Sequence, residues 1–278
     1  MATLYAEEPL ANVAYCHDGS LEGFFSAVFE TYLRHEEPSD ITAAGLLQPR
    51  LGQSLRYIET DEVAASRVRK GIIRAGGQAT FRIVVKAFLA DHPQKDSYLY
   101  VFIAKLMRLE REDKKAAQEM LDNLTDSAVD PVIKLARSVD QECEKMRQFL
   151  RFQHTNDGIW FAKINPKANV VPLIMGHFQA RMGNAAFLIY DENHNIAGIS
   201  AGRGWRLVQT DSVDLPQLSE DEEQMQKAWK HFYDSLTITE RYHPELRQSF
   251  MPQRLWKNIT EIQDEIVPSK PRLNQSRE

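Results

Sequence analysis

The chain has 278 residues, of which 43% are hydrophobic and 26% are charged, and its formal net charge is −5. This length corresponds to one large domain or two modest ones, and the apolar fraction excludes a wholly disordered chain. No stretch approaches about 18 uninterrupted apolar residues, so no membrane-spanning helix is expected. The first residues lack the basic and apolar regions of a signal peptide. We therefore expect a cytoplasmic globular protein that makes no contact with a membrane.

The charges are segregated along the sequence. Residues 1–62 carry eleven acids against three arginines, and residues 211–240 carry eight acids against two lysines. By contrast, residues 67–86 carry six bases and no acid, and residues 144–182 carry six bases against two acids. An acidic protein can therefore still present a basic face to phosphate groups. The alternative is that these bases neutralise neighbouring acidic helices.

The first half of the chain is predicted to be mostly helical. Residues 12–16 are β-prone, and residues 55–59 alternate as a second strand that could pair with them. Apolar residues at helical spacing predict helices over residues 21–32, 60–75, 78–91, 97–109, 114–124 and 131–151. Ser20 or Asp18 can cap the first helix, and Gly76 with Gly77 is expected to end the second.

The pattern changes near Gln153, where strands become frequent. Strands are predicted over 158–164, 186–190 and 196–200, and a turn at 191–194 makes the last two a hairpin. A helix is predicted over 170–182, and Ser219 opens a capping box that begins an acidic helix. One or two short helices should follow near the C-terminus.

These patterns predict an α+β fold. The N-terminal half is mainly helical with a small strand pair, and the C-terminal half is mixed α/β with a short antiparallel sheet. The expected organisation is a mostly helical subdomain over 1–152, an α+β subdomain over 153–262 and a disordered tail over 263–278.

Two pairs of residues are candidates for chemistry. His177 and Arg181 are four residues apart on one face of a predicted helix, where they could hold a phosphate or where His177 could shuttle a proton. Tyr190 and Asp191 end a strand, a common position for functional side chains. A packed histidine beside an interhelical arginine, and an ordinary turn aspartate, are the alternatives.

Several arginines are candidates for contacts with nucleic acid. Arg147 and Arg151 alternate with phenylalanines at the end of the long helix, a mixture suited to phosphates and unstacked bases. Arg254 and Trp256 are close enough for a cation–π contact or base stacking. The basic segment adds Arg67, Arg69 and Arg74. The alternative is that the aromatic rings belong to the core and the arginines are solvated.

Other classes of site are excluded by missing motifs. The sequence has no phosphate-binding P-loop, no dinucleotide fingerprint, no nucleophile elbow and no cysteine triad for a radical-SAM cluster. Its eight histidines are scattered, so we expect neither a metal nor a cofactor. Cys16 and Cys143 are interpreted as structural thiols, because two cysteines are too few for a disulfide scaffold.

A series of motifs resembles a bacterial family described as probable DNA metabolism proteins, which carries a domain of unknown function. The motifs lie at residues 15–24, 28–30, 60–61, 67–68, 149–152, 177–181, 188–191 and 247–256. Together they cover roughly residues 13–262 in the order found in that family. Residues 144–147 depart from the family, because a histidine–arginine pair is expected there.

The resemblance implies a link to DNA repair or modification. Members of the family accompany a radical-SAM protein assigned to DNA modification, and some are joined to a domain similar to uracil-DNA glycosylase. No activity is established for the family, so the resemblance assigns no catalytic residue.

The leading hypothesis is an accessory protein of DNA metabolism that binds DNA, a radical-SAM partner, or both through its basic segments. The expected site is lined by Arg151, His177, Arg181, Tyr190 and Asp191. One alternative is an enzyme acting on a nucleobase or nucleic acid, with His177 as general acid/base beside Asp191. Another is a protein–protein adaptor, which would expose an apolar patch and have no affinity for DNA.

Overall fold

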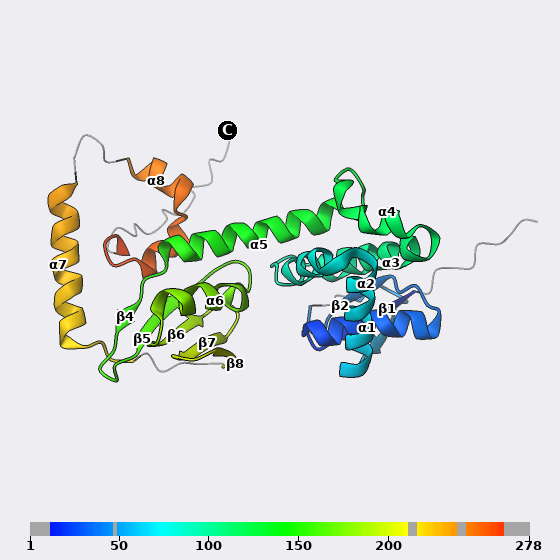
Figure 1. The fold of residues 1–278 in the computed structure, drawn as a ribbon, viewed down its shortest axis with the longest axis horizontal. Coiled ribbons are helices and arrows are strands. Elements are labelled where there is room, and N and C mark those ends of the chain that lie inside the picture. Colours follow the sequence, from blue (N-terminus) through cyan, green and yellow to red (C-terminus); the bar gives the residue numbers. More distant parts are fainter. Residues whose placement is uncertain (1–11, 47–48, 211–215, 238–242, 264–278) are drawn as a thin grey trace, which may run out of the picture. The chain divides into compact units, whose positions relative to one another are not determined.

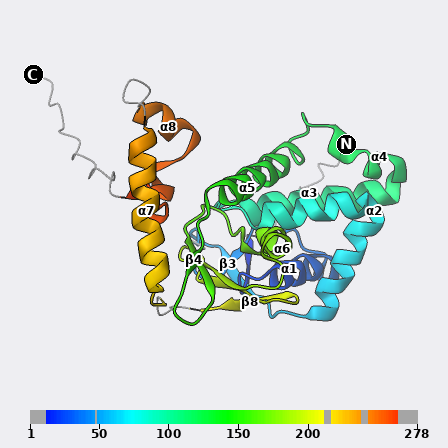
Figure 2. The same cartoon turned by 60° about the vertical axis from the view of Figure 1, so that its left-hand side comes forward.

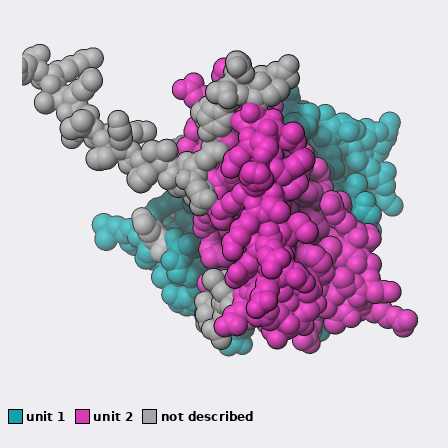
Figure 3. Space-filling view, turned by 90° about the vertical axis from the view of Figure 1, so that its left-hand side faces the viewer, with its two compact units in different colours: residues 1–140 teal, residues 141–278 magenta. Residues whose placement is uncertain are grey.

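The computed structural model describes residues 12–46, 49–210, 216–237 and 243–263 (Figure 1). The chain divides into two compact units, residues 1–140 and 141–278, which Figure 3 distinguishes by colour. The division falls inside helix α5 (Asp130–Phe149). The sequence analysis instead placed the boundary between the helical and the α+β subdomain after residue 152. Apart from Gln263, the predicted tail lies outside the described residues. Among the helices of the described ranges, none is both long and apolar enough to span a bilayer.

Unit 1 contains a three-stranded sheet in the order β2-β1-β3. Its strands are β1 (Val13–His17), β2 (Asp40–Ala43) and β3 (Ser54–Tyr57), and both outer strands run parallel to β1. The predicted pairing of the first two strand segments is confirmed as the β1–β3 pair. The predicted strand pair is incomplete, however, because β2 adds a third strand that pairs with the other edge of β1. Parallel strands need long connections, and the connection from β1 to β2 contains α1.

The helices of unit 1 correspond to the predicted helical segments. They are α1 (Leu21–Arg34), α2 (Glu62–Phe88), α3 (Lys95–Glu112), α4 (Lys114–Gln118), η1 (Met120–Asp122) and the first part of α5. Ser20 caps α1 as predicted, because its side chain accepts a hydrogen bond from the backbone N–H of Gly23. The apolar face of α1 is buried through Phe24, Phe25 and Val28.

The segment α2 contains two helices that meet at a kink at Gly77, where the backbone is not helical. Gly77 has φ +81°, a left-handed conformation that glycine adopts without the steric cost of a side chain. The chain resumes helical geometry immediately afterwards, so the segments predicted over 60–75 and 78–91 are two helices joined at this kink. The predicted end of the first helix at Gly76 and Gly77 is therefore confirmed.

The sheet of unit 2 has the order β4-β5-β6-β7-β8. Its strands are β4 (Gln153–His154), β5 (Trp160–Ile164), β6 (Ala186–Asp191), β7 (Ile196–Ala201) and β8 (Trp205–Gln209). The pairs β4–β5, β6–β7 and β7–β8 are antiparallel, and β6–β7 is the predicted hairpin. The sheet is nevertheless mixed, because β5 and β6 are parallel. This one pair departs from the expected antiparallel pattern because the α6 crossover returns the chain in the same direction. The α+β class itself is confirmed.

Helix α6 (Val171–Met182) lies over one face of this sheet (Figures 1 and 2). It buries Val171, Ile174 and Met175. The approach to β7 is so close that a Cβ built on Gly198 would lie 2.3 Å from the sulfur of Met175. A residue without a side chain is therefore required at this point of the sheet.

Three helical segments complete unit 2: α7 (Glu220–Leu236), α8 (Pro244–Phe250) and η3 (Gln253–Asn258). Ser219 caps α7 as predicted, because its hydroxyl accepts from the N–H of Glu222 at 3.2 Å. No residue of α7 is buried. In contrast, η3 buries Leu255 and Trp256 and so belongs to the core of the unit.

Candidate functional site

The predicted arginines of unit 2 are held mainly in ion pairs within the fold. Arg147 pairs with Glu144, one turn earlier on α5. Arg151 donates to Glu261 at 3.1 Å. Each contact pairs the guanidinium charge with a carboxylate of the fold, which is the alternative that the sequence analysis gave for these bases.

Arg254 has the most extensive set of partners among these arginines. Its Nη2 lies 2.8 and 2.6 Å from the two carboxylate oxygens of Glu142, and its Nη1 donates to the carbonyl of Asn165 at 3.0 Å. Glu142 also accepts from the ammonium of Lys145 and from the backbone N–H of Lys167. Burial would raise the pKa of Glu142, but these donors and the charge of Arg254 outweigh it and lower the pKa.

Trp256 is part of the core of unit 2. Its side chain is 3% exposed, and its indole N–H donates to the carbonyl of Met251 at 2.9 Å. The guanidinium of Arg247 lies 4.7 Å from the centroid of the Trp256 ring. The cation–π contact with Trp256 was predicted for Arg254, but Arg247 forms it instead, within the fold.

His177 and Arg181 share the outward face of α6. Both are exposed, while Phe178 beside them is buried. The His177 ring packs edge-on against Phe178, with centroids 5.1 Å apart. In the described part of the chain, Arg181 forms no ion pair, so this pair is open to an external anion.

Tyr190 and Asp191 point to opposite faces of β6 and are both buried. Tyr190 belongs to an apolar cluster with Phe161 and Ala197. Asp191 has zero exposure, and its Oδ2 lies 2.6 Å from Nδ1 of His194, while its Oδ1 accepts from the N–H of Asn193. Asp191 thus organises the β6–β7 turn, and its histidine partner is His194, not His177.

The predicted arginines of unit 1 all lie on α2 and are exposed. Arg74 forms a two-point ion pair with Glu110, at 2.6 and 3.0 Å. Arg67 and Arg69 lie over the rings of Phe29 and Phe81, at 5.7 and 5.2 Å from the centroids. Neither Arg67 nor Arg69 forms an ion pair among the described residues, so their guanidinium N–H groups can donate to phosphate oxygens.

Three of the α2 bases lie on one face of the helix. Arg67, Lys70 and Arg74 follow at intervals of three and four residues, and all three are exposed. We call these residues the α2 basic face. Because the segment from 67 to 86 contains no acid, the face has no carboxylate on its own helix over that length.

A buried histidine–aspartate pair in unit 1 was not anticipated from the sequence. Nε2 of His17, at the end of β1, lies 3.2 Å from Oδ2 of Asp96, in the first turn of α3. The N–H of Gly19 donates to Nδ1 of His17 at 3.1 Å, so Nε2 carries the ring proton and donates to Asp96. Asp96 Oδ1 is buried and has no hydrogen-bond partner among the described residues.

Both ring nitrogens of His17 are engaged, and its side chain is 1% exposed. This geometry joins the turn before α1 to the start of α3 and leaves no nitrogen free to act as a base. The two residues are 79 positions apart, so no local spacing could have identified them.

The described residues contain no group of three or more histidine, cysteine or acidic side chains that could hold a metal ion. The thiols of Cys16 and Cys143 are both buried, in separate elements. Burial raises the pKa of Cys16, which keeps its thiol protonated.

Comparison with known proteins gives one informative match. No protein with a curated description matches the sequence. A solved structure described as the DHH domain of a member of a family of ribosomal proteins is similar at 12% identity, with a TM-score of 0.27, over 69% of this chain and 74% of that chain. A TM-score this low supports no statement about the fold or function of this chain.

The sequence pattern of a domain of unknown function, DUF4130, matches residues 93–261. The match runs from the segment before α3 through most of unit 2. It covers well over half of the chain. The expectation of a domain of unknown function is thereby confirmed, and the chain belongs to the DUF4130 family.

Proposed function

We propose that this protein is an accessory protein of DNA metabolism that binds the phosphate backbone of nucleic acid through the α2 basic face. The observation that carries the proposal is the exposure of Arg67, Lys70 and Arg74 on one side of a helix segment without acids. Arg74 is paired with Glu110, so Arg67 and Lys70 are the members of the face that form no ion pair among the described residues. Most of the other predicted arginines are also ion-paired, which makes them weaker candidates.

The dimensions of the α2 basic face suit a nucleic-acid strand. Arg67 and Arg74 are seven residues apart, which corresponds to about 10 Å along the helix axis. One strand of duplex DNA presents a phosphate about every 3.4 Å along its axis, so the face can contact several phosphates. On unit 2, the exposed pair His177 and Arg181 offers a second phosphate contact.

The role in DNA repair or modification, and the radical-SAM partner, rest on the resemblance of the sequence motifs. A second observation supports a contact with a protein partner. Helix α7 exposes a stripe of apolar side chains: Met225, Trp229, Phe232 and Leu236. Exposed apolar surface of this kind is typical of protein interaction sites, so the adaptor function remains a second candidate.

The test of DNA binding is the variant Arg67→Ala/Lys70→Ala. Fluorescence anisotropy with labelled single- and double-stranded DNA should show weaker binding to all sequences. For the duplex, the slope of log affinity against log salt concentration should fall by about two, because two phosphate contacts are lost.

The matched control is Lys114→Ala/Lys115→Ala, which removes the same charge from exposed positions of α4. This control should retain the wild-type affinity and salt slope. If the α2 variant also retains both, the α2 basic face does not bind DNA.

A further inference from the structure

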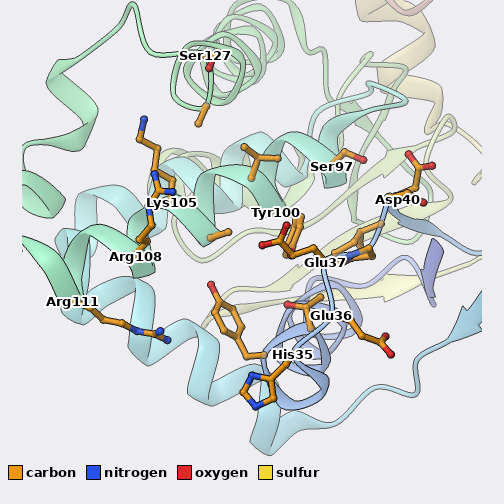
Figure 4. Close-up of a pocket in the computed structure, with 18 residues that line it drawn as sticks. His35, Glu36, Glu37, Asp40, Ser97, Tyr100, Lys105, Arg108, Arg111 and Ser127 are labelled. Carbon is orange, nitrogen blue, oxygen red and sulfur yellow. The ribbon is translucent and has the colours of Figure 1, made fainter. Parts of the chain in front are cut away.

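Unit 1 contains a large groove that none of the predicted site residues lines (Figure 4). Its walls are the end of α1, the segment leading into β2, and the outer side of α3. Its volume is about 940 Å³, within the range of small-molecule sites, which is about 300–1,000 Å³. The groove is therefore large enough for a ligand of several tens of atoms.

The charged side chains of the groove are separated by sign. Figure 4 shows Lys105, Arg108 and Arg111 along one side and acidic side chains on the opposite side, with Tyr100 between them. The acidic side chains are Glu36, Glu37 and Asp40. A ligand that fits this arrangement carries negative charge at one end and hydrogen-bond donors at the other.

Half of these charges already have partners within the fold. Lys105 pairs with Asp126, Glu36 with Arg56, and Asp40 with Arg50. In the described residues, Arg108, Arg111 and Glu37 form no ion pair. The groove therefore offers two guanidinium groups at one end and one carboxylate at the other.

An aromatic ring lies beside the guanidinium groups. The side chain of Tyr32 lines the groove, is 36% exposed and lies 6.0 Å from the guanidinium carbon of Arg111. Burial raises the pKa of Tyr32 and of Tyr100, so both remain neutral phenols at neutral pH. Tyr32 can stack with a planar ring and its hydroxyl can donate a hydrogen bond, whereas the Tyr100 hydroxyl is hydrogen-bonded to Thr31.

We propose that this groove binds a nucleoside monophosphate unit, with its phosphate on Arg108 and Arg111, its base against Tyr32, and the amino group of the base at Glu37. Arg108 and Arg111 lie one turn apart on α3 along the same side of the groove, and guanidinium groups are suited to a phosphate because they can donate several charge-assisted hydrogen bonds. Inorganic phosphate would use only the arginines, and an aliphatic zwitterion would leave the tyrosine unused. The combination therefore favours a phosphate joined to an aromatic base.

The groove is distinct from the α2 basic face, so this proposal goes beyond the proposed function and does not depend on it. The same nucleotide unit could be a free nucleotide or the 5′-phosphorylated end of a strand. Both present the same chemistry to the groove.

The test is calorimetric titration of the full chain with deoxyguanosine monophosphate, deoxythymidine monophosphate, deoxyguanosine and inorganic phosphate. We expect deoxyguanosine monophosphate to bind best. The nucleoside and phosphate alone should bind at least about tenfold more weakly, because each lacks one set of contacts. Equal binding of phosphate and the nucleotide would overturn the proposal.

Two variants locate the site. Arg108→Ala/Arg111→Ala should weaken nucleotide binding at least about tenfold. Glu37→Gln should remove the preference for the guanine nucleotide over the thymine nucleotide. The matched control Lys114→Ala/Lys115→Ala removes the same charge outside the groove and should bind like the wild type. Wild-type affinity in the Arg108→Ala/Arg111→Ala variant would overturn the proposal.

Calorimetric titration with a short single strand of DNA, with and without a 5′-phosphate, shows whether the ligand is a free nucleotide or a strand end. Tighter binding of the phosphorylated strand than of the free nucleotide identifies a strand end, and the reverse identifies a free nucleotide. If neither binds at millimolar concentration, the proposal is wrong. The variant Arg67→Ala/Lys70→Ala should keep its nucleotide affinity, so this proposal and the proposed function can fail separately.

Discussion

At the level of single residues, the ion pair between Arg254 and Glu142 has consequences for both stability and binding. Glu142 is 5% exposed and receives both of its short contacts from one guanidinium nitrogen. Removal of that cation leaves a buried carboxylate with only Lys145 as a charged partner. A buried charge that loses its partner is costly, because it has also lost its hydration.

We therefore predict that Arg254→Met lowers the free energy of unfolding by about 2–3 kcal/mol. Urea denaturation measures this change. Arg203→Met, in the exposed β7–β8 turn, is the control and should change stability by less than about 0.5 kcal/mol. The folded Arg254→Met variant should bind DNA like the wild type. Normal stability with weakened DNA binding would instead place Arg254 in the interface.

The roles of such arginines could not be predicted from the sequence. Arg151 pairs with Glu261, 110 positions away, and Arg254 pairs with Glu142 at a separation of 112. A run of bases looks the same whether its partners are phosphates or distant carboxylates. Among these three arginines, only Arg147 has a partner that its sequence neighbourhood could predict, because Glu144 lies three residues earlier on the same helix.

At the level of elements, α7 differs from the other long helices because its apolar side chains are exposed. Trp229 and Phe232 are 44% and 52% exposed, and their rings stack with centroids 5.7 Å apart. Side chains with this exposure contribute little to folding, so they can be changed to test the adaptor function.

We predict that Trp229→Gln/Phe232→Gln lowers the free energy of unfolding by less than about 1 kcal/mol but abolishes capture of the proposed radical-SAM partner in purified form. The control Lys227→Gln/His231→Gln changes two exposed polar residues of the same helix and should leave capture intact. Unchanged capture by the first variant would exclude α7 as the contact.

Element prediction succeeded where the signal is local. The caps at Ser20 and Ser219 and the apolar spacing of α1 lie within a few residues of the helices that they specify. Strand β2 was missed, although its sequence Asp-Ile-Thr-Ala alternates polar and apolar residues over the same length as β3, which was predicted. The direction of β5 relative to β6 depends on the α6 crossover, which is a property of the connection and not of either strand.

At the level of the whole molecule, both units hold carboxylates whose pKa values lie below their ordinary range. In unit 1, hydrogen bonds from Arg74 and Lys105 lower the pKa of Glu110 and of Asp126. In unit 2, burial opposes the shift at Glu142 and Glu192, but hydrogen bonds from lysines and nearby cations outweigh it. These groups bind protons more weakly in the folded state than in the unfolded state.

Stability should therefore be constant near neutral pH and fall in acid. Each depressed carboxyl contributes stability that is present above its unfolded pKa, about 4.5 for a glutamate, and is lost as the pH falls through the folded value. Urea midpoints measured from pH 7 downward should decline below about pH 5. Glu142→Gln should be less stable at pH 7 but decline less in acid. If the urea midpoint of Glu142→Gln falls in acid as steeply as that of the wild type, Glu142 is not one of the groups that cause the decline.

The two sheets also differ in how their strands are connected along the chain. In unit 2, β6 and β7 are joined by the short turn from Glu192 to Asn195, so their pairing closes only a small loop. In unit 1, β1 is joined to β2 through α1, and β3 follows only after a further long segment. Because closing a longer loop costs more chain entropy, the parallel sheet has the higher contact order and gains no strand pair from a local turn. Because α1 connects β1 to β2, we expect substitutions on the apolar face of this helix to slow the assembly of that sheet.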